Sequence, residues 1–251
     1  GKTVVGLTIL QSCLNEGKAP AIYIVPDNYL VQQVCAEAKK LGIMVACDSF
    51  DENGKRIEKG EDDYHFKTGK AILVANIHKL VNGKSIFGLR SNNNIQIGSI
   101  IIDDVHACLD TIEQQHAILI EKTHIKDKND PRHNYLIPFW VWQSECIDIY
   151  NKITAPEYAN EPFVLFNLPL LRDNWKTINC VISARGIEMT LKGIPINKIT
   201  SFDQAQRRIF MSATLSDDSV FVSAIGLKTT DISNIITPEK ANDIGERLIL
   251  F

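Results

Sequence analysis

The chain has 251 residues, with 27 Lys or Arg and 30 Asp or Glu, and a formal net charge of −3. Hydrophobic residues make up 45% of it, which is enough for a packed core and excludes disorder as the main state. The near balance of charges excludes a uniformly basic coat for nucleic acid, whereas a local basic face is compatible with it. No apolar run approaches the roughly 20 residues of a membrane-spanning helix, so we expect no contact with a membrane.

Residues 1–103 alternate between amphipathic runs with helix character and short apolar runs with strand character. The apolar runs are continuous in Val, Ile and Leu, which predicts a parallel sheet that helices cover on both faces. The polar residues 48–70 predict a loop or a small hairpin. In chain order, the predicted elements are a helix over Thr3–Asn15, a strand over Ala21–Val25, a helix over Tyr29–Leu41 that Asn28 caps and Gly42 ends, strands over Ile43–Ala46 and Ala71–Ala75, a short helix over His78–Val81, and a strand over Ser99–Asp103.

After Cys108 the apolar spacing becomes helical over longer runs. Strand character returns at Arg207–Ser212, and a helix is predicted over Asp217–Ile225. We therefore predict a mostly helical insertion over residues 110–200, within an α/β domain formed by residues 1–109 and 201–251. Helices of the insertion are predicted over residues 111–123, 137–153 and 168–189.

The start of the chain and its cysteines bear on its context. The first residue is Gly rather than Met, and no signal peptide follows, so we expect a fragment of an intracellular protein. The six cysteines are scattered and form no CxxC pair, which gives no support to a zinc or iron–sulfur site. Reduced thiols and a cytoplasmic location are the expectation.

The first three residues, Gly1-Lys2-Thr3, have the form of the end of a phosphate-binding loop, GxxxxGK[ST]. In the complete motif, backbone N–H groups and a helix N-terminus hold phosphate oxygens, the Lys reaches the β and γ phosphates, and the Thr hydroxyl binds Mg²⁺. The preceding strand and the first Gly of the motif are missing here. Alone, the three residues are weak evidence for a nucleotide site.

Two further strand ends carry polar side chains. The strand Ser99–Asp103 delivers Asp103 and the adjacent Asp104 to the sheet edge. There the first carboxylate can hold Mg²⁺ and the second can orient a water; the alternative is a solvated strand end. Ser212 and Thr214 follow another predicted strand, where their hydroxyls can relay hydrogen bonds or simply cap the next helix.

The order of these segments is more specific than any one of them. Together they resemble motifs I, Ia, Ib, II and III of the first RecA-like domain of superfamily 2 helicases of the DEAD/DEAH-box type. The resemblance covers residues 1–106 and 207–227. In order, the matching segments are Gly1-Lys2-Thr3, Val25–Gln33, Ile72–Leu80, Asp103-Asp104-Val105-His106 and Ser212-Ala213-Thr214.

The resemblance implies a RecA-like, three-layer P-loop fold and an ATP-dependent helicase or translocase that uses ATP and Mg²⁺. It also implies nucleic acid and a second RecA-like domain as partners. By position, Gly1, Lys2 and His106 belong to the nucleotide site, Thr3 and Asp103 to Mg²⁺, and Asp104 to the attacking water, with Lys2 and Asp104 as catalytic residues. Ser212 and Thr214 are implied to couple nucleotide state to nucleic-acid binding, along a path that includes Pro26, Asn28, Gln33, Asn76 and Lys79.

Several positions depart from the family pattern. Asp104 stands where the family has Glu and is one methylene shorter, and a displacement of about 1 Å can cost about a hundredfold in rate. Asp27 and Asn76 replace Thr, and Ile77 replaces Pro. The alternatives are therefore a nucleotide-gated binding module with little or no hydrolysis, or a domain whose insertion docks a partner protein. Without a second domain's arginine, the chain by itself is expected to be a poor ATPase.

Overall fold

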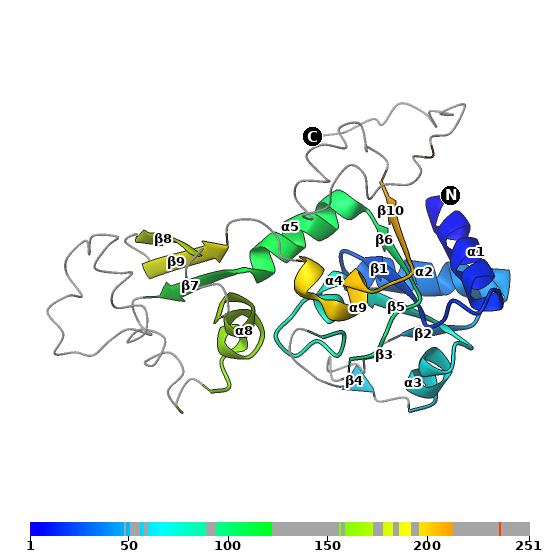
Figure 1. Ribbon diagram of the computed structural model, residues 1–251, viewed down its shortest axis with the longest axis horizontal. Helices are drawn as coiled ribbons and strands as arrows, with labels where there is room; N and C mark the ends of the chain where they lie inside the picture. Colours follow the sequence, from blue (N-terminus) through cyan, green and yellow to red (C-terminus); the bar gives the residue numbers. More distant parts are fainter. Residues whose placement is uncertain are drawn as a thin grey trace, which may run out of the picture.

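The computed structural model describes residues 1–47, 49–50, 56–57, 60–88, 94–121, 156, 159–172, 178–182, 186–191, 196–212 and 236. Its centre is a sheet of five parallel strands in the order β10–β6–β1–β5–β2 (Figure 1). This confirms the predicted RecA-like α/β fold. The strands are β1 (Ala21–Val25), β2 (Val45–Cys47), β5 (Ile72–Asn76), β6 (Ser99–Asp103) and β10 (Arg207–Met211).

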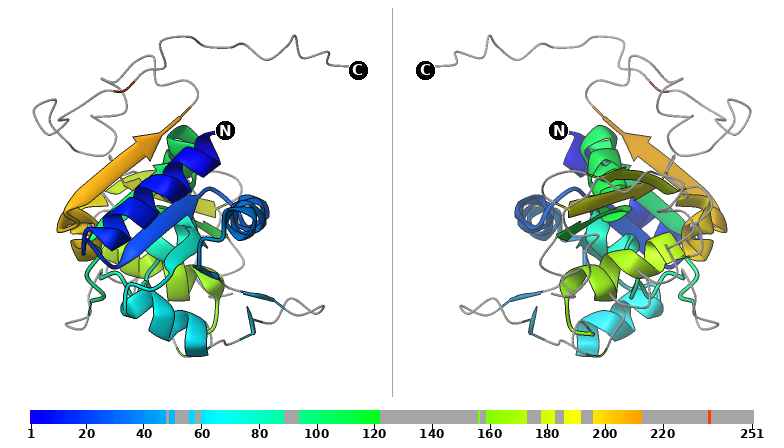
Figure 2. Two further views of the ribbon diagram at one scale, coloured as in Figure 1. Left: turned by 90° about the vertical axis from the view of Figure 1, so that its right-hand side faces the viewer. Right: turned by 90° about the vertical axis from the view of Figure 1, so that its left-hand side faces the viewer.

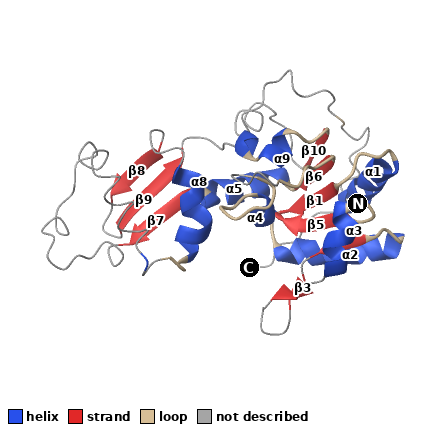
Figure 3. Cartoon of the chain, turned by 60° about the horizontal axis from the view of Figure 1, so that its bottom comes forward, coloured by secondary structure: helices blue, strands red, loops and turns tan. Residues whose placement is uncertain are grey.

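Strand β1 is buried along its whole length, because helices cover both faces of the sheet. Its side chains alternate between two cores: Ile22 and Ile24 belong to one, and Tyr23 and Val25 to the other. The core of Tyr23 lies beneath α1 (Lys2–Asn15) and α2 (Asn28–Leu41). The opposite core lies beneath α4 (Ile77–Leu80), α5 (Val105–Gln115) and α9 (Thr200–Asp203), as Figure 3 shows.

The polar stretch predicted as a loop or small hairpin holds a two-stranded antiparallel pair. Its strands are β3 (Ser49–Phe50) and β4 (Arg56–Ile57). Helix α3 (Gly60–Lys67) follows, and its Phe66 packs into the core beneath α4 and α5. Within the described part of the chain, no helix is long and apolar enough to span a membrane.

A second, antiparallel sheet lies beyond the end of α5 (Figure 1). It has the order β7 (Ala117–Glu121), β9 (Gly186–Leu191) and β8 (Ile178–Ile182). The predicted helices over 111–123 and 168–189 are wrong where these strands occur. Ile118 pairs with Met189, and a pairing so distant in sequence leaves no local periodicity that would predict it.

The remaining described helices of this segment are η3 (Phe163–Asn167), α8 (Leu168–Arg172) and η5 (Ile196–Lys198). Where it is described, the segment therefore combines helices with an antiparallel sheet. The predicted helices over 137–153 and 217–225 lie outside the described residues. The boundaries of the predicted insertion stay a prediction.

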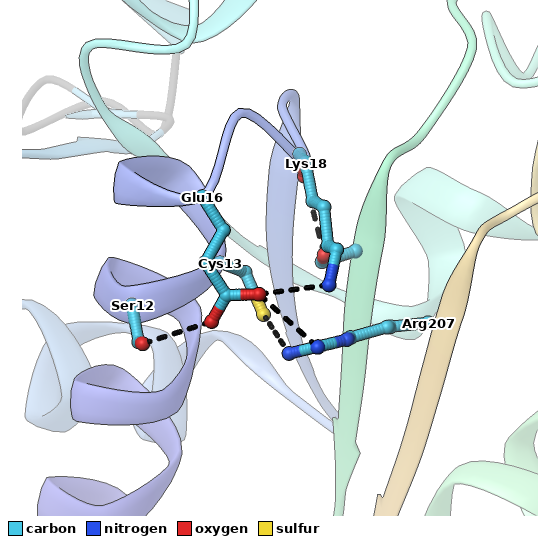
Figure 4. Close-up of polar contacts among 6 residues, drawn as sticks. Ser12, Cys13, Glu16, Lys18 and Arg207 are labelled. Atoms are coloured by element: carbon cyan, nitrogen blue, oxygen red, sulfur yellow. Dashed lines mark hydrogen bonds and ion pairs between the residues drawn. The ribbon is translucent and has the colours of Figure 1, made fainter.

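Polar contacts join α1 to β10 at the amino-terminal end of the strands (Figure 4). Glu16, which follows α1, accepts hydrogen bonds from Lys18 at 2.7 Å and Ser12 at 3.2 Å. Arg207, the first residue of β10, lies 3.1 Å from the same carboxylate and donates to the thiol of Cys13 at 3.6 Å. The Lys18 and Ser12 hydrogen bonds lower the pKa of Glu16. Figure 2 shows β10, so anchored, at the margin of the sheet.

Candidate nucleotide-binding site

The carboxyl ends of the parallel strands bring the residues that resemble motif I and motif II together. Helix α1 begins at Lys2, and β6 ends at Asp103. The Nζ of Lys2 lies 3.7 Å from Oδ1 of Asp103, with the side chains 47% and 13% exposed. Gly1 caps α1 without a side chain, and a Cβ built there would meet nothing within 4 Å. The first turn of α1 therefore lies beside an ammonium and a carboxylate.

Asp103 is held by two hydrogen bonds, one to each carboxylate oxygen. The backbone N–H of Asp104 donates to Oδ1 at 2.9 Å. The hydroxyl of Tyr23 donates to Oδ2 at 2.7 Å. Tyr23 is not among the predicted site residues, because a Tyr inside an apolar strand is typical of a core residue. The available signal was the phenol itself, since a buried Tyr hydroxyl usually finds a hydrogen-bond partner.

Asp104 adopts a left-handed backbone conformation, with φ 51° and ψ 59°, at the start of α5. Among the described residues it is the one non-glycine residue with positive φ. Such a conformation costs about 1 to 3 kcal/mol and tends to occur at functional sites. The side chain of Asp104 makes no capping hydrogen bond to α5. The strained residue is the one predicted to act on the attacking water.

The first turn of α5, which follows Asp103 and Asp104, contributes Cys108 and His106 to the surroundings of the site. Cys108 of α5 donates a hydrogen bond from its thiol to the carbonyl of Asp103 at 3.4 Å. Burial, reinforced by the negative charges of Asp104, Asp103 and Asp27, raises the pKa of Cys108, so the thiol stays protonated. His106 lies in the first turn of the same helix, partly buried. This end of α5 therefore offers the site no thiolate.

The predicted coupling residues follow β10. Met211, the last residue of β10, pairs in register with Asp103 of β6. Ser212 therefore follows the sheet beside the segment that resembles motif II. Thr214 lies outside the described residues. The structure thus brings one of the two predicted hydroxyl residues to the edge that carries Asp103.

The predicted nucleic-acid path begins with helix caps. The side chain of Asp27 accepts a hydrogen bond from the N–H of Leu30 at 2.9 Å, so Asp27, not Asn28, caps α2. This corrects the predicted cap. Asp27 has the extended backbone of an N-cap, and the helix dipole favours a carboxylate at this end. The negative charge that departs from the family pattern therefore has a structural use.

Two residues of the predicted path contact each other. The side-chain amide of Asn76 donates to the side-chain oxygen of Asn28 at 2.6 Å. The oxygen of Asn76 accepts from the N–H of Lys79 at 3.2 Å and so caps α4. Gln33 is exposed on α2, and Pro26 is partly buried at the end of β1. The structure therefore brings segments Ia and Ib side by side.

These groups fit a magnesium–nucleotide complex by their chemistry. Mg²⁺ is commonly held by one or two protein oxygens together with substrate phosphates, and Asp103 and Thr3 can supply such oxygens. Phosphates bind at helix N-termini beside cations, which α1 and Lys2 offer. The donor set of this edge is therefore suited to ATP and Mg²⁺.

Comparison with known proteins agrees with this geometry. A family model described as DEAD/DEAH box helicase matches residues 1–136. Comparison with curated proteins and with solved structures gave no match. The matched residues include α1, the carboxyl ends of β1, β5 and β6, and the start of α5. With more than half of its length matched, the chain belongs to the DEAD/DEAH box helicase family.

Proposed function

We propose that this chain is the ATP-binding domain of a helicase or translocase that moves along nucleic acid. The observation that carries the proposal is the meeting of Lys2 and Asp103, whose Nζ and Oδ1 lie 3.7 Å apart at the first turn of α1. Two residues of the matched region that lie far apart in the sequence meet there. Their chemistry is that of phosphate and metal binding. The proposal includes a second RecA-like domain, which completes the site, and a cytoplasmic location, supported by the buried thiols of Cys13 and Cys108.

The residues divide the work as follows. The ammonium of Lys2 and the N–H groups of α1 bind and orient the phosphates. Thr3 and Asp103 hold Mg²⁺, which when bound neutralises charge on the phosphates. Asp104 orients the attacking water, from the left-handed backbone position that follows β6. Electrostatic positioning of this kind supplies most of the catalysis in phosphoryl transfer.

The route from nucleotide to nucleic acid runs along the same sheet edge. Asn28 and Asn76 join segments Ia and Ib, which we propose contact the backbone of the strand together with Pro26, Gln33 and Lys79. Ser212 follows β10, and we propose that it couples the two sites with Thr214. The hydrogen bond between Asn28 and Asn76 joins the two segments at this edge of the sheet.

The test is ATP turnover by the protein expressed from its complete reading frame, with no nucleic acid, with single-stranded DNA and with single-stranded RNA. We expect one polymer to stimulate turnover, and Lys2→Ala to lower it about 100-fold, as loss of a group that stabilises transition-state charge does. The matched control is Lys67→Ala. Lys67 is 52% exposed and pairs with Asp63, as Lys2 pairs with Asp103. Equal turnover in Lys2→Ala and wild type contradicts the proposal.

The shorter side chain of Asp104 favours a second candidate, a nucleotide-gated binding module with little hydrolysis. The Asp104→Glu variant separates the two. A gain of turnover in Asp104→Glu, with MgATP binding unchanged, supports the binding module. Rapid turnover by the wild type excludes it.

A further inference from the structure

One buried side chain lies directly beneath the proposed magnesium site without belonging to it. Tyr23 is the polar residue of β1, and it is fully buried between apolar neighbours. Its ring lies in the core beneath α1 and α2, and its hydroxyl reaches the end of β6. A Phe would fill the same core, so the hydroxyl needs a separate explanation.

The hydroxyl distinguishes the two oxygens of Asp103. Oδ2 accepts the hydrogen bond from Tyr23 at 2.7 Å, inside the protein. Oδ1 lies 3.7 Å from Nζ of Lys2, beside the first turn of α1, and accepts a hydrogen bond from the backbone N–H of Asp104 at 2.9 Å. Oδ2 is therefore occupied from the core, whereas Oδ1 is held by a backbone donor on the nucleotide side and keeps a second lone pair for a metal. Tyr23 supplies the side-chain hydrogen bond that restrains rotation of the carboxylate about its Cβ–Cγ bond.

The phenol is the donor in its contact with Asp103, because an ionised carboxylate accepts hydrogen bonds and cannot donate them.

Helix α1 leaves room for the ring of Tyr23 at Gly6. Gly6 lies inside the helix, where a glycine is unfavourable. A Cβ there would lie 2.7 Å from Cε2 of Tyr23 and 3.3 Å from its hydroxyl oxygen. The missing side chain therefore lets α1 pack directly onto the ring of Tyr23.

We propose that Tyr23 is a positioning residue, whose hydroxyl holds Asp103 so that Oδ1 is the oxygen offered to Mg²⁺. This inference rests on the proposed function, because it assumes that Asp103 binds the metal of a nucleotide complex. Groups that orient a metal ligand from behind typically change metal affinity 10- to 100-fold when removed. Tyr23 orients Asp103 in this way through one buried hydrogen-bond donor, its hydroxyl.

The experiment measures binding of a fluorescent N-methylanthraniloyl-ADP to the protein expressed from its complete reading frame, as Mg²⁺ is titrated. In Tyr23→Phe we expect the Mg²⁺ concentration at half-saturation to rise about tenfold or more. Binding of the same nucleotide in EDTA changes little. The matched control is Ile101→Val, which thins the same core from β6 without touching a polar group. It should keep the wild-type Mg²⁺ dependence, and thermal unfolding checks that both variants fold.

A second pair of variants tests whether Tyr23 acts through Asp103. In an Asp103→Asn background, adding Tyr23→Phe should cause no further loss of Mg²⁺ dependence. An equal further loss in that background overturns the inference, because it assigns the effect to packing. A wild-type response in Tyr23→Phe also overturns it while leaving the proposed function intact. Absence of Mg²⁺-dependent nucleotide binding in the wild type overturns both.

Discussion

At the scale of single residues, the candidate site combines polar contacts with local strain. Asp103 is hydrogen-bonded at both oxygens, and the adjacent Asp104 is forced into a left-handed conformation. The buried Tyr23 sits between them and the core. The left-handed conformation of Asp104 costs folding free energy that the packed sheet around it offsets. The site is therefore built before any ligand arrives.

Gly6 gives a test of this packing. An Ala in place of a Gly inside a helix ordinarily stabilises a protein by about 0.5–1 kcal/mol. Here the added Cβ would overlap Cε2 of Tyr23 at 2.7 Å, so we expect Gly6→Ala to lower the free energy of unfolding by about 1–3 kcal/mol. Urea unfolding measures the change. Thr8→Ala, on the exposed face of α1, is the control. A Gly6→Ala variant more stable than wild type contradicts this account.

At the scale of elements, the carboxyl edge of the sheet is lined by helix starts. Helices α1, α2, α4 and α5 all begin there, each directly after a strand or at Gly1. Helix N-termini attract anions. Asn76, a residue of the predicted nucleic-acid path, caps α4, and Asp27, which lies between the path residues Pro26 and Asn28, caps α2. Residues that hold the fold and residues proposed to meet the strand are thus partly the same.

Asp27 separates these two uses. Asp27→Ala removes the hydrogen bond to Leu30, and we expect it to lower the free energy of unfolding by about 0.5–2 kcal/mol. Asp27→Asn keeps a capping oxygen and removes the negative charge. It should be close to wild type in urea unfolding and should bind single-stranded nucleic acid more tightly. Equal destabilisation by both substitutions would show that the charge, not the cap, matters.

At the scale of the whole molecule, α5 connects two sheets. It starts at Asp104 beside the candidate site and ends at His116, where β7 begins. Asn167 of η3 donates to the carbonyl of Gln115 at this end, and the N–H of Gly83 donates to the carbonyl of Phe166. These two hydrogen bonds tie the segment around the antiparallel sheet to the parallel-sheet domain.

His116 makes this junction sensitive to pH. It is buried, and its Nδ1–H donates to the carbonyl of Ile112 at 2.8 Å. Burial lowers the pKa of His116, and the positive charge of Lys198 lowers it further. In the unfolded chain the pKa is about 6.5, so the neutral ring's contribution to stability is complete above that pH. It is lost as the pH falls from about 6.5 toward the lower folded pKa, because the unfolded state takes up the proton first.

Urea unfolding between pH 7.5 and 5 measures this effect. We expect the free energy of unfolding of the wild type to fall as the pH decreases. In His116→Gln, which does not titrate, this component should be missing. Parallel pH profiles for the two proteins would show that His116 does not contribute.

The sequence by itself determined the parallel α/β domain and the order of its motifs. Continuous apolar strands such as Ser99–Asp103 indicate burial on both faces of the sheet. The residue types of Lys2 and Asp103 by themselves indicate phosphate and metal binding. Contacts between distant segments were decided by the tertiary structure alone. From the sequence, Tyr23 is expected in the core and β7 is expected to be helical. The hydrogen bond from Tyr23 to Asp103 at the end of β6, and the pairing of β7 with β9, depend on contacts between distant segments. Local periodicity reports which face of an element is buried, but not what lies against it, because that depends on chain folding over long sequence distances.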